Sequence, residues 1–263
     1  MLDLFEADAL AAAGVVISTP GHPYPPMPAP PYRPVESRNW KFHARTFPIL
    51  PGYFNGPMPV DWTTFLLVRD DVTWMSLVPA EVESQMPHLA AARGTVVVCG
   101  LGLGLMAYAV SALKAVDRLV VVERDREVAE MFHDYAQFSA WPQRSKVELV
   151  IEDARAFKKA GVDFLYADIW PFYRMDAMVE DMKAMHANIP APACGYWGQE
   201  IDMVDFAVAQ GIPVEEFGPE HVRAFASAHG LPLIGMENPN YPELCRRAAV
   251  NPAIGGKRIP IER

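Results

Sequence analysis

Three glycines follow one short apolar segment in the middle of the chain. The segment reads GTVVVCG, and Gly100, Gly102 and Gly104 stand at its end. Glycine permits positive φ and lets a backbone approach a ligand without a Cβ in the way. A helix that begins directly afterwards presents unpaired amide groups. The turn is therefore a candidate ligand-binding turn.

Three acidic residues end the apolar segments that come next along the chain. Glu123, nineteen residues past Gly104, could accept hydrogen bonds from both hydroxyls of a ribose. Each such charge-assisted bond contributes about 1.5 to 3 kcal/mol when it is shielded from water. Asp153 could accept a hydrogen bond from the exocyclic amine of a purine. Asp168 precedes an aromatic and proline-containing stretch, IWPFY, that could form the floor of a site for a cationic or amine substrate.

The elements that carry these residues alternate between strand and helix patterns. Short apolar segments at 94–100, 117–123, 146–153 and 162–170 predict strands, and helical patterns lie at 105–116 and 125–138. Alternation of this kind predicts parallel strands, right-handed crossovers and helices on both faces of the sheet. Ligands bind such sheets at the carboxyl ends of the strands. The sequence therefore predicts an α/β fold with a mostly parallel sheet, preceded by a small β-rich N-terminal region.

The same residues also have purely structural interpretations. An acid at the end of a strand is often the N-cap of the next helix, and Asp125 or Asp153 could be no more than that. Four successive strand ends that bear Gly-x-Gly-x-Gly, Glu, Asp and Asp favour a nucleoside-binding site.

From about Gly94 to Asp168 the chain resembles the Rossmann-like, class I S-adenosylmethionine-dependent methyltransferases. The matching motifs are VVVCGLGLG, VVERD, IEDA and YADIWP. In the dinucleotide fingerprint the third small residue comes three positions after the second glycine, where this chain has Leu105. The resemblance implies S-adenosyl-L-methionine as cofactor. It also implies these cofactor-binding residues: Gly100, Leu101, Gly102, Gly104, Glu123, Arg124, Asp153 and Ala154.

The resemblance further implies methyl transfer to a small-molecule amine, guanidine or hydroxyl acceptor, with Asp168 as the catalytic residue. Asp168 would accept a hydrogen bond or a proton from the nucleophile. Two branches look similar: the spermidine-synthase-like proteins, which also place a β-hairpin before the nucleotide domain, and the guanidinoacetate-type N-methyltransferases. Against aminopropyl transfer, Leu103 and Pro171 stand where those enzymes carry acids. Two further functions stay open: an NAD-dependent oxidoreductase, which Leu105 disfavours, and a non-catalytic nucleoside-binding protein.

The acceptor is expected to enter between the strand ends and the N-terminal region. Trp170 and Tyr173 are predicted to shape its pocket, and Trp74 to line the mouth. Glu81 and Glu83 are candidates for contacting it, although such residues are more often a solvated helix face.

Two domains are predicted, at 1–92 and 93–263. The first contains a proline-rich arm at 20–34, expected to lie extended on the surface or to bridge subunits, and a β-hairpin at 63–76 that turns at Asp70 and Asp71. A helix at 79–92 is expected to kink or split at Pro87. In the second domain, 195–200 is a possible fifth strand and 203–211 and 218–230 are predicted helices. The terminal antiparallel hairpin of a standard methyltransferase has no clear counterpart.

Composition restricts the partners and the location. The net charge is −9 and no Lys/Arg cluster occurs, so nucleic acid is not an expected partner. Three scattered cysteines and seven histidines without ligand spacing predict neither a disulfide framework nor a metal site. No apolar run approaches the roughly 18 residues of a membrane span, and the acidic N-terminus is unlike a signal peptide. We therefore expect a cytoplasmic protein with a small-molecule substrate, and the proline-rich arm is compatible with a homodimer.

Overall fold

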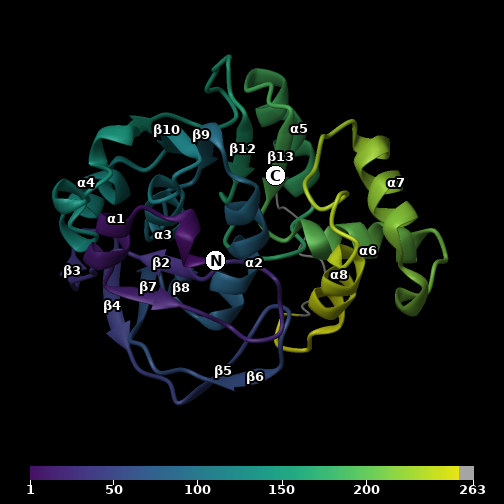
Figure 1. Cartoon of the computed structure of the whole chain (residues 1–263), viewed down its shortest axis with the longest axis horizontal. Helices are drawn as coiled ribbons and strands as arrows, with labels where there is room; N and C mark the ends of the chain where they lie inside the picture. The colour runs from purple at the N-terminus through teal and green to yellow at the C-terminus, as the bar shows by residue number, and fades with distance from the viewer. Residues whose placement is uncertain (255–263) are drawn as a thin grey trace.

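A computed structural model gives the structure of residues 1–254, and its centre is a parallel sheet (Figure 1). Within those residues the sheet has five strands in the order β11-β10-β9-β12-β13, all parallel. Their bounds are β9 (Gly94–Cys99), β10 (Val116–Glu123), β11 (Val147–Ile151), β12 (Phe164–Ala167) and β13 (Ala193–Tyr196). The strands predicted from the sequence are therefore present, and the fold is Rossmann-like.

The strand order reverses at β9, which lies in the middle of the sheet. The chain proceeds outward through α3 (Leu105–Ser111), β10, α4 (Arg126–Tyr135) and β11, then crosses to β12 on the other side of β9. From β12 it reaches β13 through α5 (Met178–Asn188). Right-handed crossovers in opposite directions place helices on both faces of the sheet, and the reversal opens a crevice at the carboxyl ends of β9 and β12.

Helix α3 is shorter than its sequence pattern predicts. The pattern runs to residue 116, but the helix ends at Ser111, and the next residues pair with the N-terminus of the chain. The amide of Glu6 donates to the carbonyl of Ala112 (2.8 Å), and that of Lys114 donates to Leu4 (2.9 Å). Two short N-terminal helical segments lie at Leu2–Leu4 (η1) and Ala7–Ala12 (α1).

An antiparallel sheet forms the N-terminal region and lies below the parallel sheet in Figure 1. Its strands pair in the order β3 (Val35–Glu36), β4 (Lys41–Arg45), β7 (Thr64–Arg69) and β8 (Val72–Ser76). The predicted hairpin is confirmed: Asp70 and Asp71 turn between β7 and β8 with φ of 50° and 60°, as a two-residue turn of the primed kind requires. A separate pair, β5 (Ile49–Pro51) and β6 (Pro57–Pro59), extends beyond this sheet.

The proline-rich arm is not the surface arm that the sequence predicted. Residues 25–30 are buried, and β2 (Met27–Ala29) pairs with β1 (Val15–Ile17) in a two-stranded antiparallel sheet. Strand β2 also packs against α3. Proline lacks an amide donor but carries an apolar ring, so a proline-containing strand can be buried where an edge leaves its missing donor unused.

Helix α2 (Pro79–Ala91) runs through Pro87 as a single helix, so the predicted split is wrong. An internal proline costs about 3 kcal/mol through its missing amide and its clash with the preceding turn. Every residue from Val82 to Leu89 is buried, and that burial outweighs the cost of the proline.

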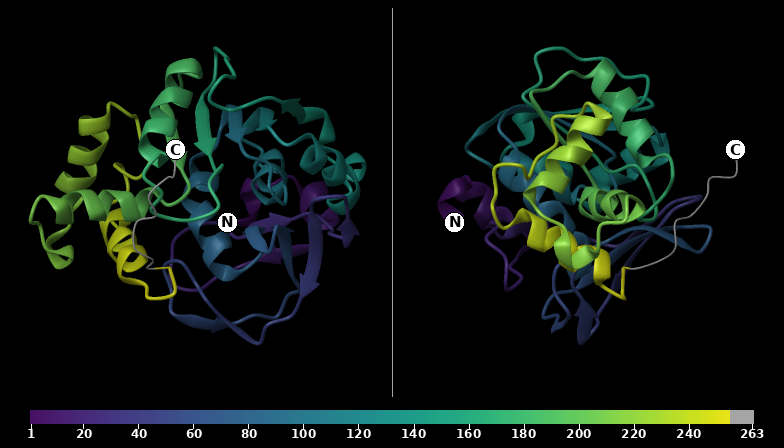
Figure 2. Two further views of the ribbon diagram at one scale, coloured as in Figure 1. Left: turned by 180° about the vertical axis from the view of Figure 1, so that it is seen from behind. Right: turned by 90° about the vertical axis from the view of Figure 1, so that its right-hand side faces the viewer.

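The C-terminal third is helical and lies on the β13 side of the sheet in Figure 1; it forms the left side of the molecule in the left view of Figure 2. It contains α6 (Gln199–Ala209), α7 (Pro219–His229) and α8 (Tyr241–Val250). Within residues 1–254 only an isolated bridge, from Cys194 to Leu233, extends the sheet beyond β13. The sheet of the described chain therefore ends without a terminal antiparallel hairpin. Three 3₁₀ turns complete the elements: η2 (Phe138–Ala140), η3 (Arg144–Lys146) and η4 (Val214–Glu216).

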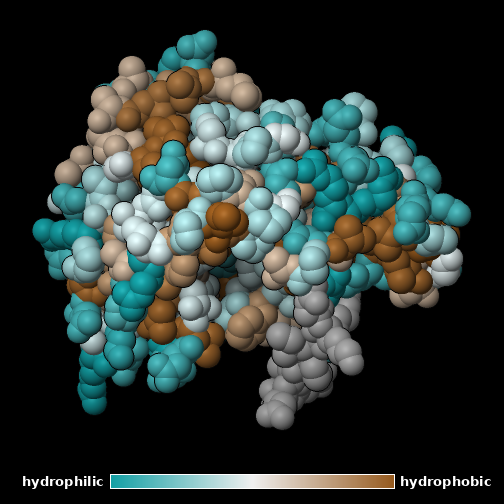
Figure 3. All heavy atoms as spheres, turned by 90° about the horizontal axis from the view of Figure 1, so that it is seen from below, coloured by the Kyte–Doolittle hydropathy of each residue, from teal (hydrophilic) through white to brown (hydrophobic). Residues whose placement is uncertain are grey.

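The surface seen from below is mixed in character (Figure 3). Hydrophilic side chains cover most of it, and hydrophobic ones gather in separate groups. No helix among residues 1–254 is both long enough and apolar enough to cross a lipid bilayer. The three cysteines are buried free thiols.

Glu83 connects α2 to the β5–β6 loop. Its side chain is completely buried, and Oε2 accepts hydrogen bonds from the amides of Tyr53 (2.7 Å), Phe54 (2.8 Å) and Asn55 (3.3 Å). Oε1 accepts a fourth, from Nδ2 of Asn55 (2.6 Å). The expectation that Glu83 contacts substrate is wrong, because its carboxylate is occupied within the fold.

The Glu83→Ala substitution should lower the free energy of unfolding by about 3 kcal/mol or more, since it leaves buried amides without an acceptor. Urea denaturation measures the change. The exposed Glu130 on α4 provides a matched control, and Glu130→Ala should change stability by less than about 0.5 kcal/mol. Equal effects of the two substitutions would contradict the role assigned to Glu83.

Candidate nucleotide-binding site

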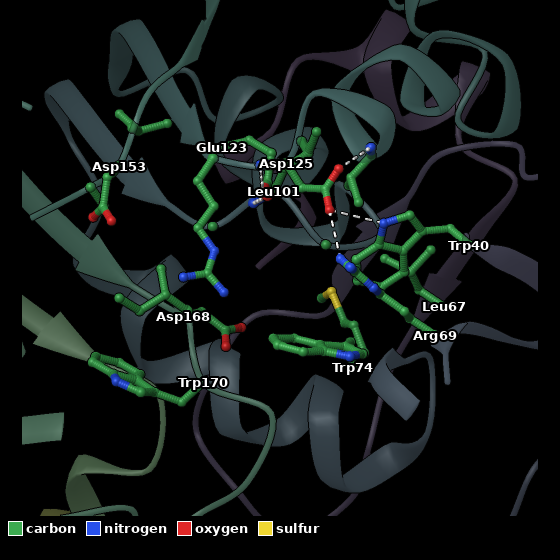
Figure 4. A pocket seen from close by; sticks show the side chains of 18 of the residues that line it. Trp40, Leu67, Arg69, Trp74, Leu101, Glu123, Asp125, Asp153, Asp168 and Trp170 are labelled. Carbon is green, nitrogen blue, oxygen red and sulfur yellow. Dashed lines mark hydrogen bonds and ion pairs between the residues drawn. The ribbon is translucent and has the colours of Figure 1, made fainter. Parts of the chain in front are cut away.

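A cavity of about 440 Å³ lies at the carboxyl ends of the parallel strands (Figure 4). This volume falls in the range of pockets that hold small molecules, about 300 to 1,000 Å³. One side is made largely by residues that follow β9, β10, β11 and β12. The opposite side is made by Trp40, which directly precedes β4, and by side chains from β7 and β8. The N-terminal sheet therefore supplies part of the wall.

Most of the site residues predicted from the sequence line this cavity. They are Gly100, Leu101, Gly102, Glu123, Arg124, Asp153, Ala154, Asp168, Trp170 and Trp74. Gly104, Tyr173 and Glu81 do not line it. In Figure 4 Glu123, Leu101 and Asp125 lie on one side of the cavity, and Asp168 lies on the other, between Trp170 and Trp74.

The glycines of the β9–α3 turn are required by close packing against other protein atoms. Gly100 has φ of 97°, and a Cβ there would overlap the backbone carbonyl of Asp168. Gly104 has φ of 74°, and a Cβ there would overlap the ring of Phe132 on α4. Gly104 thus lets α4 pack against the start of α3, and it does not line the cavity; its predicted cofactor contact stays a prediction.

Glu123 is held in place by the turn beside it. Its Oε2 accepts a hydrogen bond from the amide of Leu101 (3.0 Å), and Oε1 accepts one from the amide of Asp125 (2.8 Å). Burial raises the pKa of Glu123, and these two amides oppose the rise. Each carboxylate oxygen has a second lone pair available, so the side chain is oriented to accept two hydroxyl groups from the cavity.

Asp125 joins the two sheets next to Glu123. Its Oδ1 accepts hydrogen bonds from the amides of Glu127 (2.9 Å) and Val128 (3.3 Å), which caps α4 as the sequence suggested. Its Oδ2 accepts from Nε1 of Trp40 (3.0 Å) and from Nη1 of Arg69 (3.1 Å). The Asp125 carboxylate thus caps the N-terminus of α4 and also holds two wall residues, Trp40 and Arg69, of the N-terminal region.

A second set of polar contacts fixes the wall at Trp170. The amide of Arg155 donates to Asp153 (2.9 Å), and the Arg155 guanidinium makes two hydrogen bonds to Asp181, at 2.7 and 2.8 Å. Nε1 of Trp170 donates to the same Asp181 (2.9 Å). Trp170 is 4% exposed, so its ring is a rigid boundary of the cavity.

Asp168 is held by α2. Nε2 of Gln85 donates to its Oδ2 (3.2 Å). Burial raises the pKa of Asp168 to about 7. The pKa of Glu81, one turn before Gln85 on α2, is raised well above its ordinary value by burial and then by the charge of Asp168. Glu81 therefore lies close to Asp168, although it does not form the cavity wall.

The structure does not support the predicted role of Tyr173 in the pocket. Its ring stacks on Trp197, with centroids 3.8 Å apart, and on Tyr53, with centroids 5.5 Å apart. The ring is therefore part of the packing of the β12–α5 loop against the β5–β6 loop and the residue that follows β13.

Several wall residues do not follow from the sequence patterns: Trp40, Arg69, Met75 and Tyr166. Neither does Gln85, which does not line the cavity but donates to Asp168. Most of these residues are placed through the register of the N-terminal antiparallel sheet or through α2, and a single strand or helix pattern does not reveal such placement. Tyr166 belongs to the YADIWP motif, whose pattern at that position indicates only a strand. No group of three or more His, Cys, Asp or Glu side chains in residues 1–254 is arranged to hold a metal ion.

Solved structures with a similar fold include spermidine synthase from Thermotoga maritima and the CcbJ methyltransferase from Streptomyces caelestis. The first is 17% identical, with 62% of this chain and 55% of that chain covered and a TM-score of 0.37. The second is 19% identical, with 39% and 41% covered and a TM-score of 0.31. The match thus spans about half the length of the spermidine synthase. The sequence matches no protein-family model and none of the curated proteins. The Rossmann-like fold that the sequence predicted is confirmed by the order and direction of the strands in the parallel sheet.

The Gly100→Ala substitution should destabilise the protein and abolish ligand binding in the cavity, because the new methyl group overlaps a backbone carbonyl that has no room to move. Gly161 gives a matched control: it also has positive φ (70°), but a Cβ there meets nothing within 4 Å. Gly161→Ala should therefore cost only the conformational strain, about 1 to 2 kcal/mol. Thermal and urea denaturation measure the stability of the Gly100→Ala and Gly161→Ala variants. A similar loss of stability in both would contradict the close approach of Gly100 to Asp168.

The raised pKa of Asp168 predicts a pH-dependent effect of Asp168→Asn. Between its unfolded pKa, near 4, and its folded pKa of about 7, the folded state retains a proton that the unfolded state loses, so stability falls as pH rises. The variant lacks this loss and should gain about 2 kcal/mol relative to the wild type between pH 5 and pH 8. Urea denaturation at both pH values tests this, with Glu130→Gln, a substitution of an exposed carboxyl group, as the control. A stability difference that is the same at both pH values would contradict the assignment.

Proposed function

We propose that the protein is an S-adenosyl-L-methionine-dependent methyltransferase that acts on a small-molecule acceptor. The observation that carries the proposal is the arrangement of Glu123 at the end of β10. Its carboxylate is oriented by the amides of Leu101 and Asp125 and lies at the wall of the cavity. A partly buried acid in this position suits the two hydroxyls of a ribose.

The remaining walls fit the other parts of an adenosyl compound. Asp153 and Ala154 line the cavity after β11, where a carboxylate can accept from the exocyclic amine of adenine and a small side chain leaves room for the ring. Trp74 and Trp40 stand on the opposite wall, their ring centroids 5.8 Å apart. Aromatic faces attract cations. The Arg69 guanidinium already lies over the Trp40 ring, so the Trp74 ring is the part of this wall that suits a sulfonium centre.

S-adenosyl-L-methionine would supply an activated methyl group, and the residues of the chain would supply alignment. Holding reactants in attack geometry contributes several kcal/mol to lowering a barrier, up to about 7 to 11 kcal/mol in well-oriented systems. Asp168 lies on the far side of the cavity from Glu123, where it can accept a proton from an approaching nucleophile. Trp170, fixed by Asp181, bounds the acceptor side.

Aminopropyl transfer is the second candidate, and the hairpin β7–β8 before the parallel sheet favours it. Two residues disfavour it. Leu103 is completely buried, with its amide directed at Sδ of Met75 (2.9 Å), and Pro171 cannot provide an acid. Against an oxidoreductase, Leu105 is completely buried at the first position of α3 and does not provide the small residue of a dinucleotide fingerprint.

Thermal-shift measurements with S-adenosylhomocysteine and with NADH test the proposal. A ligand at about one hundred times its dissociation constant adds about 2.7 kcal/mol of stability, so S-adenosylhomocysteine should raise the melting temperature and NADH should not. Glu123→Gln should remove most of this shift, while Glu130→Gln should leave it intact. No shift with S-adenosylhomocysteine in a folded sample would contradict the proposal.

Incubation with S-adenosylmethionine or its decarboxylated form, each with a mixture of small amines and alcohols, separates the two transfer reactions. Mass spectrometry should find an acceptor heavier by one methyl group with the first donor. Products that carry an aminopropyl group, formed with the second donor alone, would favour aminopropyl transfer instead.

A further inference from the structure

Asp181 connects two parts of the cavity wall, although it does not line the cavity itself. It belongs to the first turn of α5, and its side chain is 14% exposed. Oδ1 accepts from Nε of Arg155 (2.7 Å), and Oδ2 accepts from Nη2 of Arg155 (2.8 Å) and from Nε1 of Trp170 (2.9 Å). Arg155 follows β11 and Trp170 follows β12, on opposite sides of β9. One carboxylate thus joins two strand ends that are not neighbours in the sheet.

Arg155 has two carboxylates within reach and makes its short contacts with only one of them. Its guanidinium forms the two hydrogen bonds to Asp181, whereas Nη1 lies 3.6 Å from Oδ1 of Asp153. The Arg155 amide donates to the same Oδ1 (2.9 Å). Within residues 1–254, Oδ2 of Asp153 therefore accepts no hydrogen bond. A two-bond contact between arginine and a carboxylate is stronger and more specific in geometry than a single one, so Asp181 keeps the guanidinium away from this oxygen.

We propose that Asp181 is a positioning residue for both ends of the ligand. By holding Arg155, it leaves Oδ2 of Asp153 available to the exocyclic amine of adenine. By holding the indole of Trp170, it fixes the wall on the acceptor side. Figure 4 shows Asp153 and Trp170 on the same side of the cavity, at the left of the view. The inference rests on the proposed function and adds to it a residue that acts without touching the ligand.

The charge of Asp181 is what this role requires. An asparagine there has one acceptor oxygen in place of two, and its NH₂ group faces the donors of Arg155 or Trp170. Asp153 is then the remaining carboxylate beside Arg155, and we expect the guanidinium to move to it and to occupy the oxygen meant for adenine. Arg124 also lines the cavity, but within residues 1–254 it forms no ion pair, so it does not share Asp181.

Isothermal titration calorimetry with S-adenosylhomocysteine, and with its analogue that carries purine in place of adenine, tests the adenine end. The two ligands differ only in the exocyclic amine. The wild type should bind S-adenosylhomocysteine at least about five-fold more tightly than the analogue. Asp181→Asn should remove most of this preference and change the affinity for the analogue less than about two-fold. A general loss of stability would weaken both ligands equally.

The indole N–H of Trp170 reports the other end of the network. In the ¹H–¹⁵N spectrum of protein labelled at its six tryptophans, Trp170→Phe identifies the signal of this residue. Asp181→Asn should move that signal upfield, because a hydrogen bond to a charged acceptor is replaced by a weaker one. Glu180→Gln is the matched control, since Glu180 lies in the same first turn of α5, is 70% exposed and pairs with Lys183. It should change neither the signal nor the preference for adenine.

Removal of Arg155 from the variant separates the two ends. In Asp181→Asn/Arg155→Gln no guanidinium is left to occupy Asp153, so the preference for S-adenosylhomocysteine should return while the Trp170 signal stays upfield. This double variant also lacks the cation that Asp181→Asn leaves without its main partner. If Asp181→Asn does not fold, as judged by circular dichroism, the double variant tests the proposal by itself.

Four results would overturn the inference. They are equal binding of the two ligands by the wild type, a folded Asp181→Asn variant that keeps the preference for adenine, a Trp170 signal that does not move in that variant, and a double variant that lacks the preference. Each is compatible with normal binding of S-adenosylhomocysteine to the wild type, and the proposed function would then stand. No binding of S-adenosylhomocysteine to the folded wild type would instead contradict the proposed function.

Discussion

The backbone of Gly100 lies so close to that of Asp168 that no side chain fits between them, and the cavity depends on this contact. It forces the turn after β9 to adopt a positive φ and brings the end of β12 beside that turn. The strand order provides the other condition. Because the order of the strands reverses at β9, the carboxyl ends of β9, β10 and β12 surround one crevice. The amides of the turn orient Glu123, and Asp168 is placed across the cavity from it.

The parallel sheet alone makes only one side of the site. The other side depends on Asp125, whose two oxygens have separate partners: one caps α4, and the other holds Trp40 and Arg69 of the N-terminal sheet. Arg69 lies over the Trp40 ring, 5.4 Å from its centroid, which adds a cation–π contact to the junction. The wall opposite Glu123 is thus connected to the strand end that bears Glu123. Hydrogen bonds from Ser37 and Asn39 to Glu127 on α4 join the same two parts of the chain, so Asp125 acts with Glu127 in positioning the two sides of the cavity.

The sequence predicts well whatever depends on local pattern. The buried strands, the Asp70–Asp71 turn and the strand-end acids follow from apolar runs and turn residues, and their positions agree with the structure. Features set by packing between distant segments were not predictable. Burial of the proline-rich segment depends on α3, and continuity of α2 through Pro87 depends on burial of that helix on all sides. Gln85 and Glu81 likewise reach Asp168 through the packing of α2 against the sheet, which no spacing rule encodes.

The central claim is that the cavity holds an adenosyl compound with its ribose on Glu123. A crystal structure of the protein grown with S-adenosylhomocysteine tests it most directly. The account predicts density in the cavity, with both ribose hydroxyls within hydrogen-bonding distance of Glu123, the adenine beside Ala154 and the sulfur facing Asp168. Density for the ligand at another place on the protein, or a cavity filled only by water at saturating ligand, would contradict it.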